Sequence, residues 1–283
     1  LMRESVVQKS PLFVAATLRE VEGRGDMRTL AGLATAVRRE WLAELFPHLF
    51  STRVEHLYDR THKRVSVVRQ ERIMGLVIHR EHLSGDDGFS REASGRCLAD
   101  AQREGCFELP NFNYALKQFI GRVNLVAAAM PELEWPRFDD RAIRECLARA
   151  FAGLKLAKDA QACSLDDAFA AHLAPEQREW LDELAPTSIA WLEDRRLKLL
   201  YAESLDASAS TSSLPEAQVK LHEIFSLREH PRVCEGRVAV KLWLCAPDGK
   251  RIEPTTDWPA FRAGQYPKLK SGLQKKYPGF VWL

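Results

Sequence analysis

The sequence lacks a phosphate-binding loop. A nucleotide cradle needs several glycines ahead of a Gly-Lys-Ser or Gly-Lys-Thr, because backbone amides must approach the phosphates closely. The Gly-Lys pair at Gly249-Lys250 is followed by Arg251 and has no earlier glycine at the right distance. Asp182-Glu183-Leu184-Ala185 resembles an acidic magnesium motif, but it ends an expected helix and no apolar strand precedes it. We therefore expect no motor activity from this chain alone.

Other catalytic patterns are also missing. The sequence contains no Gly-x-Ser-x-Gly and no His-Glu-x-x-His. His79 and His82 are three residues apart, but they lie where an expected strand runs into a loop, so they do not share a helix face. The carboxylate pairs Asp139-Asp140 and Asp166-Asp167 each start an expected helix, where capping explains them. The sequence predicts no catalytic residue, no metal site and no cofactor.

Paired cysteines and long apolar runs are absent too. No two cysteines have the spacing of a zinc knuckle, which favours free thiols in a reducing cytoplasm. The longest apolar stretch, Val123 to Met130, is interrupted by Asn124 and is far too short to span a membrane. Leu1 to Ser5 lack the layout of a signal peptide and do not begin with Met. We expect a cytoplasmic segment of a longer protein, without a membrane partner.

What the chain does have is an uneven charge distribution. Residues 1–84 carry 14 Lys and Arg against 10 Asp and Glu, and residues 215–283 carry 12 against 7. The middle, residues 85–214, is acidic, with 15 against 22. Basic ends indicate binding of a polyanion, although an ordinary solvated surface explains the same excess.

Hydrophobic periodicity predicts an α+β fold in three parts: a small OB-like β unit at 1–84, a helical segment at 85–186 and an α/β module at 187–283. In the first part we expect a hairpin over 12–37 that turns at 22–26 and a short helix over 39–46. Two strands follow, and we expect the second to extend to Ile78.

In the helical part, the last helix is expected to run from Pro175 to Pro186 and to bury Trp180. Beyond it, we expect a hairpin over 188–201 that turns at 193–194, and a mobile loop over 206–213. Ser213 and Glu216 predict a capping box, with a helix behind it. A strand at 237–245 and helices over 257–277 complete the chain.

Two segments resemble a known family. Met27 to Pro47 resembles the strand-then-helix element in the OB-fold of DEAH-box helicases, and Glu40-Trp41-Leu42-Ala43-Glu44-Leu45-Phe46-Pro47 matches the Glu-Trp-Leu-x-Glu-Leu-x-Pro core of that element. A longer series resembles the C-terminal domain of HrpB-type bacterial helicases. It comprises Asp182–Thr187, Val219–Leu227, Pro231–Val233, Gly236–Val238, Leu242–Leu244, Pro247–Lys250, Thr256–Trp258, Phe261, Gly264, Tyr266-Pro267, Lys270, Leu273 and Tyr277-Pro278. The end, Gly279 to Leu283, departs from the family's basic and Pro-rich tail.

The resemblance implies the non-motor C-terminal part of an ATP-dependent RNA helicase. Such a parent would be a hydrolase that binds ATP and magnesium in motor domains upstream, and those domains would be partners of this segment. An OB surface binds single strands through basic side chains and stacking rings. We therefore expect single-stranded RNA to contact the chain, at Arg64, Arg69, Arg72, Arg262, Tyr266, Lys268, Lys270, Lys275, Lys276 and Tyr277.

The C-terminal group is the sharper candidate for RNA contact, because residues 262–283 contain five cations and no Asp or Glu. Packing of the same helix on a strand, with lysines that serve only solubility, explains the pattern equally well. Two other readings stay open: a structural or protein-docking appendage without RNA contact, and an enzyme of unrecognised type.

Overall fold

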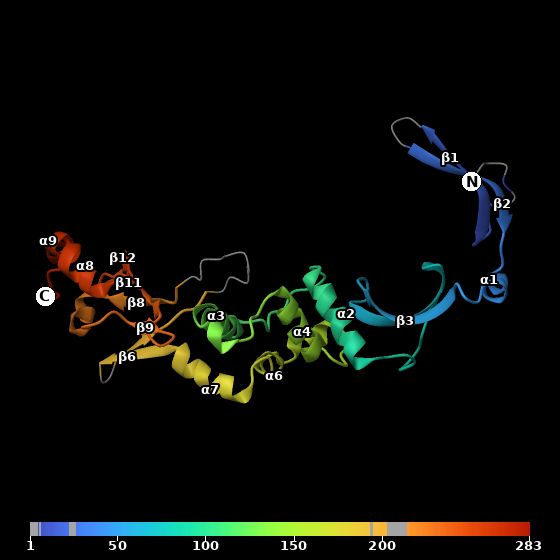
Figure 1. Ribbon diagram of the computed structural model, residues 1–283. Helices are drawn as coiled ribbons and strands as arrows, with labels where there is room; N and C mark the ends of the chain where they lie inside the picture. Colours follow the sequence, from blue (N-terminus) through green and yellow to red (C-terminus); the bar gives the residue numbers. More distant parts are fainter. Residues whose placement is uncertain (1–4, 6, 23–26, 193–194, 203–213) are drawn as a thin grey trace.

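The computed structural model is an elongated molecule, with the N-terminal strands at one end and the C-terminal helices at the other (Figure 1). The structure describes residues 5, 7–22, 27–192, 195–202 and 214–283. Helices and small separate sheets follow one another along the chain, which confirms the α+β class. The expected loop over 206–213 and the turn residues 23–26 and 193–194 lie outside the described residues. In the part described, no helix is long and apolar enough to cross a bilayer.

The N-terminal part consists of a hairpin, a short helix and a three-stranded antiparallel sheet. Its elements are β1 (Phe13–Glu22), β2 (Met27–Ala36), α1 (Arg39–Leu45), β3 (Phe50–Asp59), β4 (Arg64–Ile73) and β5 (Leu76–His82). The hairpin and the short helix confirm the prediction. The expected extension of the second strand to Ile78 is wrong, because Met74 and Gly75 have φ of 48° and 86° and form a tight turn. Positive φ at two successive residues suits a hairpin turn, so β5 folds back onto β4.

This N-terminal part has almost no core of its own. Among the described residues before Ser90, the buried hydrophobic side chains are Val7, Val65 and Val68. Its strands pair in two separate sheets and not in one closed barrel, so the OB-like architecture stays a prediction. The sheet is instead hydrogen-bonded to the helical part. The Val65 amide donates to the Lys155 carbonyl at 2.8 Å, and the Ala157 amide donates to the Lys63 carbonyl at 3.0 Å.

The middle part is helical, as predicted. It contains α2 (Arg91–Arg103), α3 (Tyr114–Ala129), η1 (Pro131–Leu133), α4 (Asp140–Ala150), α5 (Ala157–Ala162), α6 (Asp166–Ala170) and α7 (Pro175–Leu184). Asp139 caps α4, and its carboxylate accepts from the Ala142 amide at 2.8 Å. The expectation that Trp180 is buried is wrong, since it is 49% exposed. The buried residues of α7 are Leu181 and Leu184.

The C-terminal part is built on a three-stranded sheet in the order β12-β11-β8. Its elements are β6 (Ser188–Leu192), β7 (Arg195–Lys198), β8 (Glu216–Lys220), η2 (Leu221–Ser226), β9 (Arg232–Val233), β10 (Val238–Ala239), β11 (Lys241–Cys245), β12 (Arg251–Thr255), α8 (Trp258–Gly264) and α9 (Tyr266–Lys276). Strands β6 and β7 form the predicted hairpin. Helices α8 and α9 confirm the prediction for 257–277.

The helix expected behind Glu216 is wrong for its first five residues, although the 3-10 helix η2 follows and buries Leu221, Ile224 and Phe225 as expected. Residues Glu216–Lys220 form β8, which pairs in parallel with β11. Ala217 and Val219 are buried, whereas Gln218 and Lys220 are exposed, so burial follows the period of two that a strand imposes. The core beneath the sheet contains fully buried Leu242, Leu244 and Trp258. The outer face of the sheet carries polar and charged side chains together with Trp243.

Candidate nucleic-acid interface

The three arginines predicted on β4 are not equivalent. Arg72 is half-buried; its guanidinium contacts a Glu55 carboxylate oxygen at 2.6 Å and the Gln70 amide oxygen at 2.8 Å. Arg69 contacts a carboxylate oxygen of Glu81 at 3.1 Å. Arg64 is exposed, and the described residues offer it no ion pair. Two of the three charges are therefore already matched by carboxylates, which weakens their attraction for phosphate.

The cations predicted near the C-terminus lie on α8 and α9. Lys268, Lys275 and Lys276 are exposed and Lys270 is half-buried. Within the described residues none of these four lysines makes an ion pair. The Arg262 guanidinium lies 5.6 Å from the centre of the Phe225 ring, and the Lys276 ammonium lies 5.3 Å from the Tyr277 ring. A helix pair with uncompensated cations attracts a polyanion.

Tyr266 requires a correction, because it is only 4% exposed and cannot offer its ring to a base. The ring packs against Phe225, with their centroids 4.8 Å apart, and burial raises the pKa of its hydroxyl. Tyr266, Leu269 and Leu273 follow one another at helical spacings of three and four residues. That apolar stripe was the sequence signal that Tyr266 faces the core.

Tyr277 holds the end of the chain in place. Its hydroxyl donates to the Asp248 carboxylate at 3.0 Å, and its carbonyl accepts from the Trp282 indole at 3.2 Å. The pKa of Asp248 is lowered, first by the backbone amide of Lys250 and also by this hydroxyl. Tyr277 is half-buried, so part of its ring stays accessible beside Lys276.

The structure does not bring the predicted arginines of β4 close to the predicted cations of α8 and α9. The sheet that contains β3 and β4 lies towards one end of the molecule, and α8 and α9 lie at the other (Figure 1). Arg64, Arg69 and Arg72 therefore cannot act on the same few nucleotides as the lysines of α9. Any RNA contact in the C-terminal part has to be assembled from that part's own side chains.

The outer face of the C-terminal sheet carries charged and aromatic residues that the sequence reasoning did not single out. The centre of the Trp243 ring lies 4.6 Å from the Lys241 ammonium and 4.4 Å from the Arg251 guanidinium. Glu216 accepts from the Trp243 indole and from Lys241, both at 2.9 Å, and the Lys241 contact contributes most to the lowered pKa of Glu216. The sequence signal for this outer face is the alternation along the strand, because Lys241 and Trp243 stand on either side of buried Leu242.

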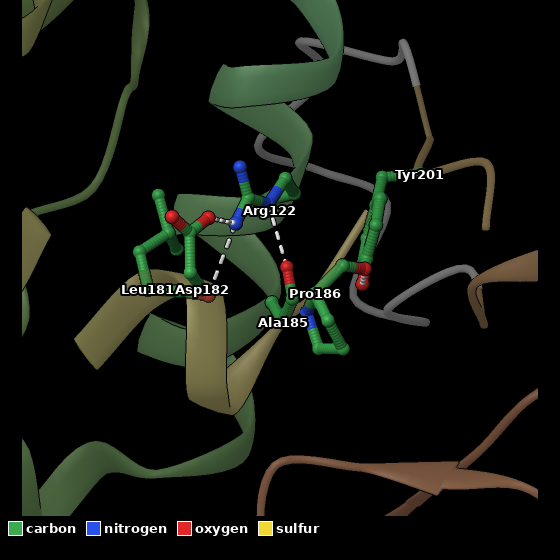
Figure 2. Close-up of polar contacts among 6 residues, drawn as sticks. All are labelled: Arg122, Leu181, Asp182, Ala185, Pro186 and Tyr201. Carbon is green, nitrogen blue, oxygen red and sulfur yellow. Dashed lines mark hydrogen bonds and ion pairs between the residues drawn. The ribbon is translucent and has the colours of Figure 1, made fainter. Parts of the chain in front are cut away.

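A buried arginine holds the C-terminal end of α7. Arg122 of α3 is 8% exposed, and its guanidinium donates to the carbonyls of Ala185 at 2.6 Å and Leu181 at 3.1 Å and also contacts Asp182 (Figure 2). Beside it, the Tyr201 hydroxyl donates to the Pro186 carbonyl at 2.6 Å. Arg122 thus donates to the Ala185 carbonyl just past the end of α7, and it shares the Leu181 carbonyl with the Ala185 amide, which donates to that oxygen at 2.9 Å.

The described residues contain no group of three or more His, Cys, Asp or Glu that could hold a metal ion. His79 and His82 both lie exposed on β5. Burial raises the pKa of the Cys97 and Cys234 thiols to about 11, which keeps them protonated at neutral pH.

Residues 146–283 match the family model described as ATP-dependent helicase C-terminal. The ATP-dependent RNA helicase HrpB of Escherichia coli (strain K12) is 22% identical over 274 residues, which cover 95% of this chain and 32% of the relative.

Two solved structures share the fold. The crystal structure of the E. coli DExH-box NTPase HrpB matches 99% of this chain and 34% of its own, with 20% identity and a TM-score of 0.67. That of the E. coli DEAH/RHA helicase HrpB matches 95% and 32%, with 20% identity and a TM-score of 0.61. The chain spans about a third of the length of these relatives. Residues 146–283 are therefore similar to the ATP-dependent helicase C-terminal family, and the chain as a whole is similar to about a third of the E. coli helicase HrpB, which supports a C-terminal HrpB-type helicase region.

Proposed function

We propose that this chain contacts single-stranded RNA and braces the motor domains of a cytoplasmic ATP-dependent RNA helicase. The motor domains of the parent would bind ATP and magnesium, and this segment would guide the strand. The named E. coli relative is an RNA helicase about three times as long, which supports a division of labour of this kind.

The observation that carries RNA contact is the charge of residues 262–283. Five cations lie there without any Asp or Glu, and the four lysines make no ion pair within the described residues. Cations that are not already paired displace condensed counterions when they meet phosphates, and the released ions drive binding. The arrangement suits a surface that follows a backbone without reading bases.

Bracing is supported by the apolar surface of the N-terminal part. Large hydrophobic side chains are exposed from Phe13 to Leu76, among them Trp41 at 45%, Leu45 at 68% and Phe46 at 42%. These three belong to the segment Glu40–Pro47 that resembles the helicase family. Large apolar side chains that are exposed together commonly mark sites where another protein surface packs. The motor domains of the parent are the partner we propose.

The alternative, a structural or docking appendage without RNA contact, has support of its own. Arg69 and Arg72 are paired with carboxylates, and Tyr266 is buried. These three residues add little to an RNA surface, so a test of RNA contact has to address the lysines of α9.

Filter binding of labelled single-stranded RNA over a range of salt concentrations tests the proposal. We expect affinity to fall steeply with salt, and the double variant Lys275→Glu, Lys276→Glu to bind roughly tenfold or more weakly. The matched control is Lys158→Glu, Arg178→Glu, which makes the same change in charge at two exposed positions of the helical part. If the chain binds no RNA at low salt, the alternative of an appendage without RNA contact is favoured. If both double variants lose the same affinity, the lysines of α9 have no specific role in RNA binding.

A further inference from the structure

A depression of about 480 Å³ lies between the β6–β7 hairpin and the edge strand of the C-terminal sheet. Its walls come from Trp191, Arg195 and Arg196 on the hairpin and from Gln218 and Lys220 on β8. The backbones of Leu200 and Glu216 exchange hydrogen bonds of 2.7 and 2.8 Å, which hold the chain after β7 against the start of β8. The depression is therefore built on paired strands, and its size falls in the range of roughly 300–1,000 Å³ typical of pockets for small ligands.

The described lining has an excess of positive charge. It contains three cations, Arg195, Arg196 and Lys220, against one carboxylate, Glu223. Glu223 lies 2.9 Å from Arg195 and neutralises it. Arg196 donates its Nε to the neutral Ser188 hydroxyl at 2.9 Å, and Lys220 makes no ion pair with any described residue. Two cations thus remain free to meet an anion.

The depression continues onto a basic face of the sheet. Glu216, Gln218 and Lys220 alternate with the buried residues of β8, so their side chains share the outer face. Gln218 pairs with Trp243, whose ring is flanked by Lys241 and Arg251. Glu216 contacts Lys241, and the charge of Arg251 also helps to lower the pKa of Glu216, so the unpaired charge of the depression rests on Arg196 and Lys220.

Resting on the RNA contact proposed above, we propose that this hairpin–sheet depression holds a phosphodiester segment of single-stranded RNA, with Arg196 and Lys220 on the phosphates and the Trp191 indole as an apolar wall for a base. Cations next to an aromatic ring are the combination with which proteins bind single strands without reading their sequence. An acidic peptide would use the two cations but would gain little from an indole wall.

The double variant Arg196→Ala, Lys220→Ala tests this assignment. We expect affinity for a labelled single-stranded oligouridylate to fall roughly tenfold, and the slope of log affinity against log salt to become shallower by about 1.4, or 0.7 for each lost phosphate contact. Lys158→Ala, Arg178→Ala is the matched control and should bind like the wild type. Quenching of tryptophan fluorescence on RNA binding should be smaller in Trp191→Phe. Both cations are exposed, and circular dichroism checks that each variant folds.

The outcomes distinguish RNA contact by the chain from RNA binding in the depression. If the wild type binds RNA and Arg196→Ala, Lys220→Ala binds with the same affinity and slope, the depression is not an RNA site, while RNA contact elsewhere on the chain stands. If the wild type binds no RNA at low salt, both proposals fail. If polyglutamate binds to the wild type and RNA does not, the depression is a site for acidic peptide and the assignment to RNA is overturned. Equal loss in the control variant also overturns it.

Discussion

Replacing Arg122 by Met should destabilise the junction between the helical and C-terminal parts. Met keeps the apolar length of the side chain but removes the hydrogen bonds to the carbonyls of Ala185 and Leu181. Hydrogen bonds from a charged donor contribute about 1.5–3 kcal/mol each. Asp182 adds little, since its side chain is 78% exposed and exposed ion pairs contribute about 0–1 kcal/mol. We expect Arg122→Met to lower the free energy of unfolding by roughly 3 kcal/mol.

Urea denaturation followed by circular dichroism measures this difference. Hydrogen exchange gives a local check, since the amides of Ala185 and Leu199 donate to Leu181 and Thr187 next to Arg122 and should lose protection. Asp182→Asn is the control and should cost less than about 1 kcal/mol. A loss below about 1 kcal/mol in Arg122→Met would refute the claim that these carbonyls depend on the guanidinium.

The remaining predictions concern packing and pH. Gly95→Ala should lower the free energy of unfolding by about 1–3 kcal/mol, measured by thermal denaturation, because the new Cβ would lie 2.1 Å from the Ala148 carbonyl oxygen. His230 accepts from the Trp258 amide at 3.1 Å and contacts the Val240 carbonyl at 2.7 Å, and burial first of all lowers its pKa below 6.5. Its neutral form therefore stabilises the fold fully above pH 6.5, and this stability is lost as pH falls through the lowered pKa. Denaturation at several pH values should show a shallower acid loss in His230→Gln, and an unchanged pH profile would contradict this.

The exposed lysines of α9 could be predicted from sequence because they depend on local chemistry. A stretch without carboxylates offers its cations no partner that is close in the sequence. The pairing of Arg69 with Glu81 and of Arg72 with Glu55 could not be predicted, since each pair joins different strands. The hairpin–sheet depression was missed for the same reason: Arg196 and Lys220 are brought together by the approach of β7 to β8.

Sequence alone determined the class of the fold, the series of helices in the middle and the absence of a nucleotide cradle. Helix caps and short-range periodicity depend on residues only a few positions apart. The Asp139 cap, for example, accepts from the Ala142 amide within one turn of the helix. Only the tertiary structure decided that Glu216–Lys220 is a strand, because its partner β11 lies more than twenty residues further along the chain. It also decided that Arg122 is buried while Trp180 is exposed, since burial depends on which distant surfaces meet and not on the residue type.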